Sequence, residues 1–220
     1  VLCVDYCRFD AIHPNASGHL EVNHFQCEGC RLCERVCPSE AISIVRNENN
    51  FWYVSNTRFG KLVHARMGPG EENSGKLVTE VRRKAKEIAV ELKADFIIND
   101  GPPGIGCSAI ASVTGTDLVL LVIEPTLSGL HDASRLVELA ESFKIPIQAV
   151  INKFDINTES TLKVEEYLAA KKIPLAGKLA FEPKMVESMV AEKTIVEFAP
   201  AEKLSNEFYS IWDKITANLT

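Results

Sequence analysis

The chain has 220 residues, of which 46% are hydrophobic and 25% charged, a balance that supports a folded core and excludes a disordered tail. Lys and Arg number 24 against 30 Asp and Glu, and the net charge of -6 argues against a general nucleic-acid binder, which needs a basic surface to contact phosphates. The longest clean apolar run, residues 118–123, is far shorter than the roughly 20 residues that cross a bilayer, and no signal peptide is recognisable. We therefore expect a soluble, cytoplasmic protein. Because the sequence opens at Val1 rather than at a methionine, we also expect residues upstream.

Cysteines dominate the beginning of the chain. Six of the seven lie within the first 37 residues: Cys3, Cys7, Cys27, Cys30, Cys33 and Cys37. A short internal repeat is visible, because a Cys-x3-Cys pair followed by Ala-Ile at residues 3–12 returns 30 residues later at residues 33–42. The run Cys-x2-Cys-x2-Cys-x3-Cys-Pro over residues 27–38 has the spacing that is typical of bacterial ferredoxins.

This spacing predicts one complete [4Fe–4S] site and half of a second. The first site takes Cys7, Cys27, Cys30 and Cys33 as ligands, because three thiolates of the run hold one cluster and the last cysteine of the other run completes it. Cys3 and Cys37 supply half of the second site, and we expect its two other ligands upstream of Val1. Zinc usually takes two cysteine pairs a dozen or more residues apart, and disulfides suit neither an odd number of cysteines nor a cytoplasmic protein.

After the polar residues 46–50 the pattern changes to alternating strands and helices. The predicted strands are residues 61–67, 95–100, 117–124, 147–152 and 175–181. The predicted helices are residues 74–93, 130–143 and 201–219. Several strands are nearly continuous Val/Ile/Leu runs, which indicates a parallel sheet covered on both faces by helices. Ligands of such sheets bind beyond the carboxyl ends of the strands.

Asp100 ends one predicted strand and precedes the glycine-rich turn Gly-Pro-Pro-Gly-Ile-Gly at residues 101–106. An Asp at a strand tip can hold Mg²⁺ directly or through water, as in nucleotide hydrolases. Glycines after it let backbone N–H groups approach a phosphate closely. A plain strand-to-helix turn that uses Pro and Gly remains the structural alternative.

Asn152-Lys-Phe-Asp155 follows another predicted strand. The Asn152 amide can hydrogen-bond the edge of a purine. Asp155 complicates the choice of base, because Asn-Lys-x-Asp resembles the guanine-reading motif of GTPases. An ordinary capped junction between a strand and a loop explains the tetrapeptide equally well.

Residues 70–77 nearly match a phosphate loop but depart from it at two points. Leu77 stands where a Ser or Thr hydroxyl would coordinate Mg²⁺, and Glu71 and Glu72 would place negative charge beside the phosphates. We therefore interpret Ser74 as the N-cap of the following helix.

Together these motifs resemble the MinD/ParA-like P-loop ATPases that carry an inserted ferredoxin domain. The resemblance rests on the tandem cysteine runs and on further segments along the chain, which are residues 59–78, 100–106, 124–132, 151–153, 181–183 and 189–191. It implies an α/β fold with a mostly parallel sheet flanked by helices and an inserted small α+β ferredoxin-like domain. We expect the insert at residues 1–48 and the C-terminal part of the nucleotide-binding domain at residues 49–220. The family's phosphate loop lies upstream of the insert, and no segment of this sequence matches it.

The resemblance also implies roles for individual residues. Asp100 would be the catalytic and Mg²⁺-binding aspartate. The resemblance also favours ATP over GTP as the nucleotide, despite Asp155. The expected nucleotide-binding residues are Asp100, Gly104, Asn152, Lys153, Phe181 and Pro183. The cofactors of the intact protein would be two [4Fe–4S] clusters, ATP and Mg²⁺.

The expected function is an ATP-binding iron–sulfur protein that couples ATP hydrolysis to electron transfer or cluster delivery, provided that a phosphate loop exists upstream. We expect a homodimer with an unidentified redox or cluster-accepting partner, and neither a membrane nor a nucleic acid as partner. One alternative is a ferredoxin-type electron carrier on an inactive ATPase scaffold. The other is a ParA-like positioning ATPase, although the basic residues in 82–86 share their helix with Glu80, Glu87 and Glu91, which favours a solvated helix face.

Overall fold

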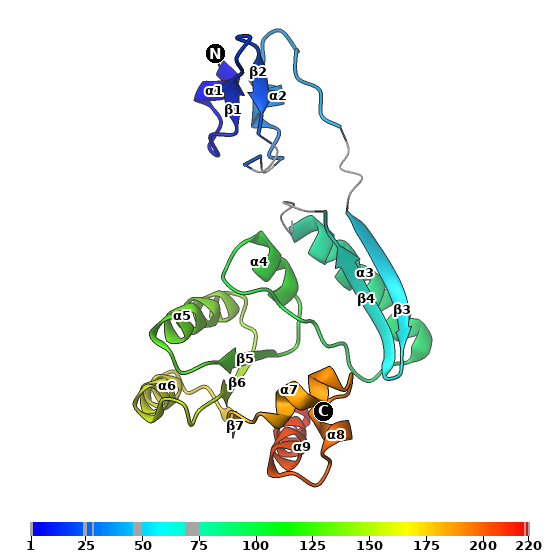
Figure 1. Cartoon of the computed structure of the whole chain (residues 1–220), viewed down its shortest axis with the longest axis vertical. Coiled ribbons are helices and arrows are strands. Elements are labelled where there is room, and N and C mark those ends of the chain that lie inside the picture. The colour runs from blue at the N-terminus through cyan, green and yellow to red at the C-terminus, as the bar shows by residue number, and fades with distance from the viewer. Residues whose placement is uncertain are drawn as a thin grey trace. The chain divides into compact units, whose positions relative to one another are not determined.

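The computed structural model describes residues 2–23, 26–27, 29–45, 50–68, 75–217 and 219. The chain divides into two compact units, Val1–Asn99 and Asp100–Thr220, each with its own secondary structure (Figure 1). The boundary that we expect between residues 48 and 49 falls inside the first unit and stays a prediction.

The cysteine-rich part of the first unit consists of two short helices and two short strands. These are α1 (Leu2–Asp5), β1 (Ile12–Pro14), β2 (Leu20–Val22) and α2 (Leu32–Arg35). The two strands pair antiparallel, and α1 contacts α2. Because α2 begins 30 residues after α1, the repeat in the sequence is also a repeat in the backbone.

The rest of the first unit is a hairpin and a long helix, namely β3 (Phe51–Thr57), β4 (Gly60–Arg66) and α3 (Gly75–Leu92). Tyr53 lies opposite His64 on paired strands, and the two rings stack with their centroids 5.4 Å apart. The strand expected over residues 61–67 is present as β4, but it pairs antiparallel with β3 and does not join a parallel sheet. Only two residues connect β3 to β4, whereas parallel strands need a crossover of a dozen or more.

Helix α3 begins at Gly75, and Ser74, which we expected to cap it, lies outside the described residues. It ends where Lys93 takes a left-handed conformation (φ 52°) and the Ala94 N–H donates to the Ala89 carbonyl. The strand expected over residues 95–100 is absent from the described structure, where this segment is an exposed loop. The expectation was wrong because a strand needs a hydrogen-bonded neighbour, and no described strand pairs with this apolar run.

The second unit contains a parallel sheet in the order β5-β6-β7. Its strands are β5 (Val119–Ile123), β6 (Ile147–Asn152) and β7 (Leu175–Leu179). Its helices are α4 (Cys107–Val113), α5 (Leu127–Ser142), α6 (Thr158–Ala170), α7 (Lys184–Val190), α8 (Ile195–Phe198) and α9 (Lys203–Thr216). The three strands and the helices after them confirm the α/β class that the apolar runs predict.

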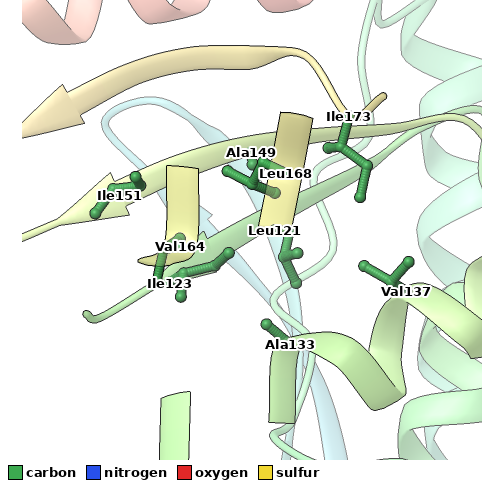
Figure 2. Packing of buried hydrophobic residues seen from close by; sticks show 9 residues of the cluster. All are labelled: Leu121, Ile123, Ala133, Val137, Ala149, Ile151, Val164, Leu168 and Ile173. Carbon is green, nitrogen blue, oxygen red and sulfur yellow. The ribbon is translucent and has the colours of Figure 1, made fainter. Parts of the chain in front are cut away.

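The core of this unit lies on both faces of the sheet. On one face, side chains of β5 and β6 pack against α5 and α6 (Figure 2), in a cluster made of Leu121, Ile123, Ala133, Val137, Ala149, Ile151, Val164, Leu168 and Ile173. On the other face, Val150 and Ala176 pack against α8 and α9. The C-terminal helix α9 therefore packs on the sheet. None of the described helices is long and apolar enough to cross a bilayer.

Polar side chains fix where the covering helices begin. The Thr126 hydroxyl accepts the Gly129 N–H at 2.9 Å at the start of α5, and the Asn157 amide accepts the Ser160 N–H at 2.9 Å at the start of α6. These caps satisfy N–H groups that have no partner inside the helix. The loops before α5 and α6, at the carboxyl end of the sheet, are thereby anchored.

Gly177 of β7 lies against Ile211 of α9. A Cβ built on Gly177 would lie 2.5 Å from Ile211 Cγ1 and 2.8 Å from Ile211 Cδ1. We expect Gly177→Ala to destabilise the second unit by about 1–3 kcal/mol, because Ile211 must leave its rotamer or α9 must move outward. Urea-induced unfolding measures this loss. Gly177→Ala should cost less in an Ile211→Ala background, which lacks both atoms, and an equal cost in the two backgrounds would contradict the steric explanation.

Candidate functional site

Two cysteine sulfurs accept backbone hydrogen bonds in repeat-related turns. The Ala11 N–H donates to Cys7 Sγ at 3.4 Å, and the Ala41 N–H donates to Cys37 Sγ at 3.4 Å. The two pairs are 30 residues apart, as the repeat in the sequence predicts. Backbone N–H groups directed at cysteine sulfur are typical of iron–sulfur sites, where they stabilise the negative charge of the cluster.

Left-handed backbone shapes the same turns and the loop between them. Asp10 and Glu40, each placed just before one of the donating alanines, have φ of 47° and 51°. In the loop of the cysteine run, Gly29 and Arg31 both have φ of 62°. Alternation of left- and right-handed residues gathers successive N–H groups on one side of the backbone, a concavity found around phosphates and iron–sulfur clusters.

Cys33 lies within electrostatic range of two other thiols of the run, Cys27 and Cys30. Burial raises the pKa of the Cys33 thiol, backbone N–H groups lower it, and the neighbouring Cys27 and Cys30 raise it further. Cys27 and Cys30 are exposed, and Cys33 is half-buried. Within the described ranges, no three His, Cys, Asp or Glu side chains are gathered tightly enough for a single metal ion. A cubane makes a different demand, because each of its four thiolates binds a separate iron.

The donor set of the module therefore fits a [4Fe–4S] cluster better than zinc. Its side-chain ligands are thiols at ferredoxin spacing, and backbone N–H groups at Cys7 and Cys37 suit the negative charge of a thiolate-ligated cluster. Cys3 is buried at 6% exposure, in α1, and Cys37 is half-buried. The assignment of Cys3 and Cys37 to a second cluster stays a prediction.

The glycine-rich turn after Asp100 leads into α4. Asp100 is exposed and accepts no hydrogen bond from the residues that the structure describes. Gly104 has φ of 82°, a conformation that a residue with a Cβ rarely adopts, and Gly106 directly precedes α4. Cys107, the first residue of α4, is exposed.

Asn152 and Lys153 lie at the carboxyl end of the central strand β6. Asn152 is the last residue of the strand and is half-buried, and Lys153 turns the chain with φ of 53°. Lys153 Nζ lies 2.5 Å from Glu124 Oε1, directly after β5. Both side chains are more than a third exposed, so the ion pair adds at most about 1 kcal/mol. Its effect is geometric, because it joins the ends of two neighbouring strands.

Phe181 and Pro183 lie in the loop after β7, next to the end of β6. Asn152 pairs in register with Leu179, two residues before Phe181. Asp155 Oδ1 accepts the Phe181 N–H at 2.7 Å. The Phe181 side chain is 51% exposed, which leaves its ring open to contact, and Pro183 directly precedes α7.

The structure thus brings Asn152, Lys153, Phe181 and Pro183 to one edge of the sheet. No hydrogen bond or ion pair among the described residues joins Asp100 or Gly104 to them. Sequence reasoning missed the contacts made by Glu124 and Asp155. The rule that ligands bind beyond the carboxyl ends of parallel strands could have directed attention to both, because each follows a strand by at most three residues.

A 4Fe-4S binding domain matches residues 20–43 of the chain. The matched segment contains Cys27, Cys30, Cys33 and Cys37 and leaves Cys3 and Cys7 outside. The iron–sulfur interpretation of the cysteine run is thereby confirmed for one cluster.

Curated relatives extend over most of the chain. MJ0578, an uncharacterized protein of Methanocaldococcus jannaschii, is 37% identical over 155 residues, which are 70% of this chain and 52% of that protein. The septum site-determining protein MinD of Bacillus subtilis is 26% identical over 142 residues, which are 61% of this chain and 52% of MinD. The chain spans about half the length of the curated relatives that it matches.

Among solved structures, the MinD cell division protein of Aquifex aeolicus is similar with a TM-score of 0.58 and 22% identity, over 74% of this chain and 68% of that protein. This similarity covers a larger share of the chain than the second unit makes up. It agrees with the parallel order of β5, β6 and β7. The chain therefore joins a 4Fe-4S binding domain to the fold of the MinD/ParA-like P-loop ATPases.

Proposed function

We propose that the protein is an iron–sulfur ATPase that couples ATP hydrolysis to electron transfer or cluster delivery. The observation that carries the proposal is the pair of N–H···S hydrogen bonds at Cys7 and Cys37, in a chain whose fold is similar to that of MinD. Cys7, Cys27, Cys30 and Cys33 hold one cluster, and Cys3 and Cys37 hold part of a second. When bound, a [4Fe–4S] cluster supplies one-electron redox chemistry.

The nucleotide part of the proposal assigns each residue a task. Asp100 orients Mg²⁺ and the attacking water, and Gly104 allows the turn to approach the terminal phosphate. The Asn152 amide hydrogen-bonds the purine edge, while the open ring of Phe181 and the adjoining Pro183 contact its face. Lys153 fixes the strand end through Glu124. An upstream phosphate loop would have to supply the remaining phosphate contacts.

Coupling requires an element with two states that both sites influence. The turn at residues 101–106 suits this task, because it leads from the exposed Asp100 to α4 and is built from Gly and Pro rather than from a strand. Loss of the terminal phosphate would release this turn. We further propose that the protein acts in the cytoplasm as a homodimer and passes electrons or a cluster to a separate protein.

The redox potential of the cluster, measured anaerobically in the complete gene product, tests the coupling. We expect Mg²⁺ and ATP to shift the potential by about 40–130 mV, which corresponds to a typical coupling factor of roughly 5 to 150 for a one-electron couple. The Asp100→Asn variant should bind ATP, and the redox potential of its cluster should shift on binding. Because this variant does not hydrolyse ATP, the potential should not return to its starting value. An unchanged potential and an unchanged rate of transfer to partners would contradict the coupling.

ATP turnover separates this proposal from an electron carrier on an inactive scaffold. Turnover that Asp100→Asn abolishes favours the ATPase, whereas binding of iron without any turnover favours the carrier. A ParA-like positioning role has less support, because two of the basic side chains of α3 are paired with glutamates on the helix itself. Arg83 contacts Glu80 and Glu87, and Lys84 contacts Glu87.

A further inference from the structure

Asp155 joins two loops that are far apart in the sequence. Its Oδ1 atom accepts the Phe181 N–H at 2.7 Å, across 26 residues of chain. Asp155 lies in the turn after β6, and Phe181 lies in the loop after β7. A hydrogen bond to a charged acceptor is about twice as strong as a neutral one. The Asp155 carboxylate therefore connects the two loops through a charge-assisted hydrogen bond.

Neighbouring contacts hold the turn that carries Asp155. The Phe154 N–H donates to the Leu179 carbonyl at 3.2 Å, and the hydroxyl of the buried Thr161 donates to the Phe154 carbonyl at 2.7 Å. On the other side, Lys153 forms the ion pair with Glu124. The turn is thus connected to the ends of β5 and β7 and to α6, and the exposed Asp155 carboxylate is held to the loop after β7 by its hydrogen bond with the Phe181 N–H.

We propose that Asp155 is a positioning residue for the purine site: it holds the loop of Phe181 and Pro183 beside Asn152 and does not read the base. The inference rests on the proposed nucleotide function. A carboxylate that reads guanine must present both oxygens to the N–H donors of that base. The Oδ1 atom of Asp155 is instead directed at a backbone N–H. The Asn-Lys-x-Asp motif is therefore a structural clamp in this chain.

The division of tasks follows from the chemistry of the two side chains. An amide offers both a donor and an acceptor, so Asn152 can form a bidentate pair with the N6 and N7 atoms of adenine. Asp155 offers only acceptors when it is ionised, and adenine presents its amino group as a donor beside acceptor nitrogens. Base recognition is therefore assigned to Asn152, and loop placement to Asp155.

Two substitutions of Asp155 distinguish a clamp from a base reader. Asp155→Asn keeps an oxygen that can accept the Phe181 N–H, whereas Asp155→Ala removes it. In the complete gene product with Mg²⁺, we expect Asp155→Ala to weaken ATP binding by about tenfold or more and Asp155→Asn by less than about fivefold. The ratio of ATP to GTP affinity should stay constant in both. Calorimetric titration with ATP and with GTP measures these affinities.

Hydrogen exchange at the Phe181 amide tests the clamp without nucleotide. Asp155→Ala should accelerate this exchange by about tenfold or more, and Asp155→Asn should largely restore protection. Glu159→Ala is the matched control, because Glu159 is an exposed acid four residues along that pairs with Lys163 instead. It should change neither readout.

The outcomes separate the inference from the proposed function. Selective loss of GTP binding in Asp155→Asn would overturn the clamp and make Asp155 a base reader. Unchanged ATP affinity in Asp155→Ala would also overturn it. If the unsubstituted protein binds neither nucleotide, the proposed function is overturned, and the positioning role falls with it. Should Asp155→Ala fail to fold, the ATP to GTP ratio in Asp155→Asn alone decides between clamp and base reader.

Discussion

We expect Cys30→Ala to lower the iron and acid-labile sulfide content of the anaerobically reconstituted chain by more than about tenfold. Changes beside a metal ligand already lower metal affinity by roughly 10- to 100-fold, and Cys30 is predicted to be a direct ligand. Cys30 is exposed, so its truncation removes no buried packing. Iron and sulfide assays, together with the visible absorption of the cluster, measure the loss.

Cys107→Ala is the matched control for this substitution. Cys107 is also an exposed free cysteine, but it begins α4 in the unit Asp100–Thr220 and is not part of the cysteine run. We expect this variant to bind as much iron and sulfide as the unsubstituted chain. Equal iron in Cys30→Ala, or a loss of iron in Cys107→Ala, would show that the ligands are assigned to the wrong cysteines.

The cysteine module could be predicted from the sequence because its signal is local. Spacing of three or four residues determines which thiols can share a cluster, and a 30-residue repeat places Cys7 and Cys37 in equivalent turns. The backbone features that complete the module were not predicted. The left-handed conformations of Asp10 and Glu40 are hard to predict from the sequence, because acidic residues adopt this conformation in a minority of cases.

The wrong strand at residues 95–100 and the correct strand at 119–123 each contain an apolar run, which is residues 96–98 in the first and the whole segment in the second. Their difference lies in pairing, because β5 has β6 beside it and the earlier segment has no described neighbour. The pattern of side chains indicates whether a segment is compatible with a sheet. A strand also needs backbone hydrogen bonds to a second strand, and that partner lies elsewhere in the sequence. The clamp at Asp155 was missed for the same reason, since its partner is 26 residues away.

Leu168→Ala should have the largest effect on folding, a loss of about 2–5 kcal/mol in the free energy of unfolding of the second unit. Leu168 is 2% exposed and lies in α6 within the cluster of Figure 2. Its carbonyl accepts the Ile173 N–H at 2.9 Å, and this backbone bond survives the substitution. Alanine has a high helix propensity, so the substitution does not weaken α6 itself. The loss of stability therefore arises from the cavity that remains between α6 and the sheet. Urea-induced unfolding measures it.

Leu162→Ala is the matched control, because it makes the same chemical change on the same helix at a side chain that is 58% exposed. It should alter stability by no more than about 0.5 kcal/mol. Iron content should be unchanged in both variants, since the cysteines of the run belong to the other unit. Helix α6 also follows the turn of Asp155 and contributes Thr161 to hold it. Leu168→Ala should therefore weaken purine binding along with stability, and a destabilised variant with full nucleotide affinity would contradict the idea that α6 supports the purine site.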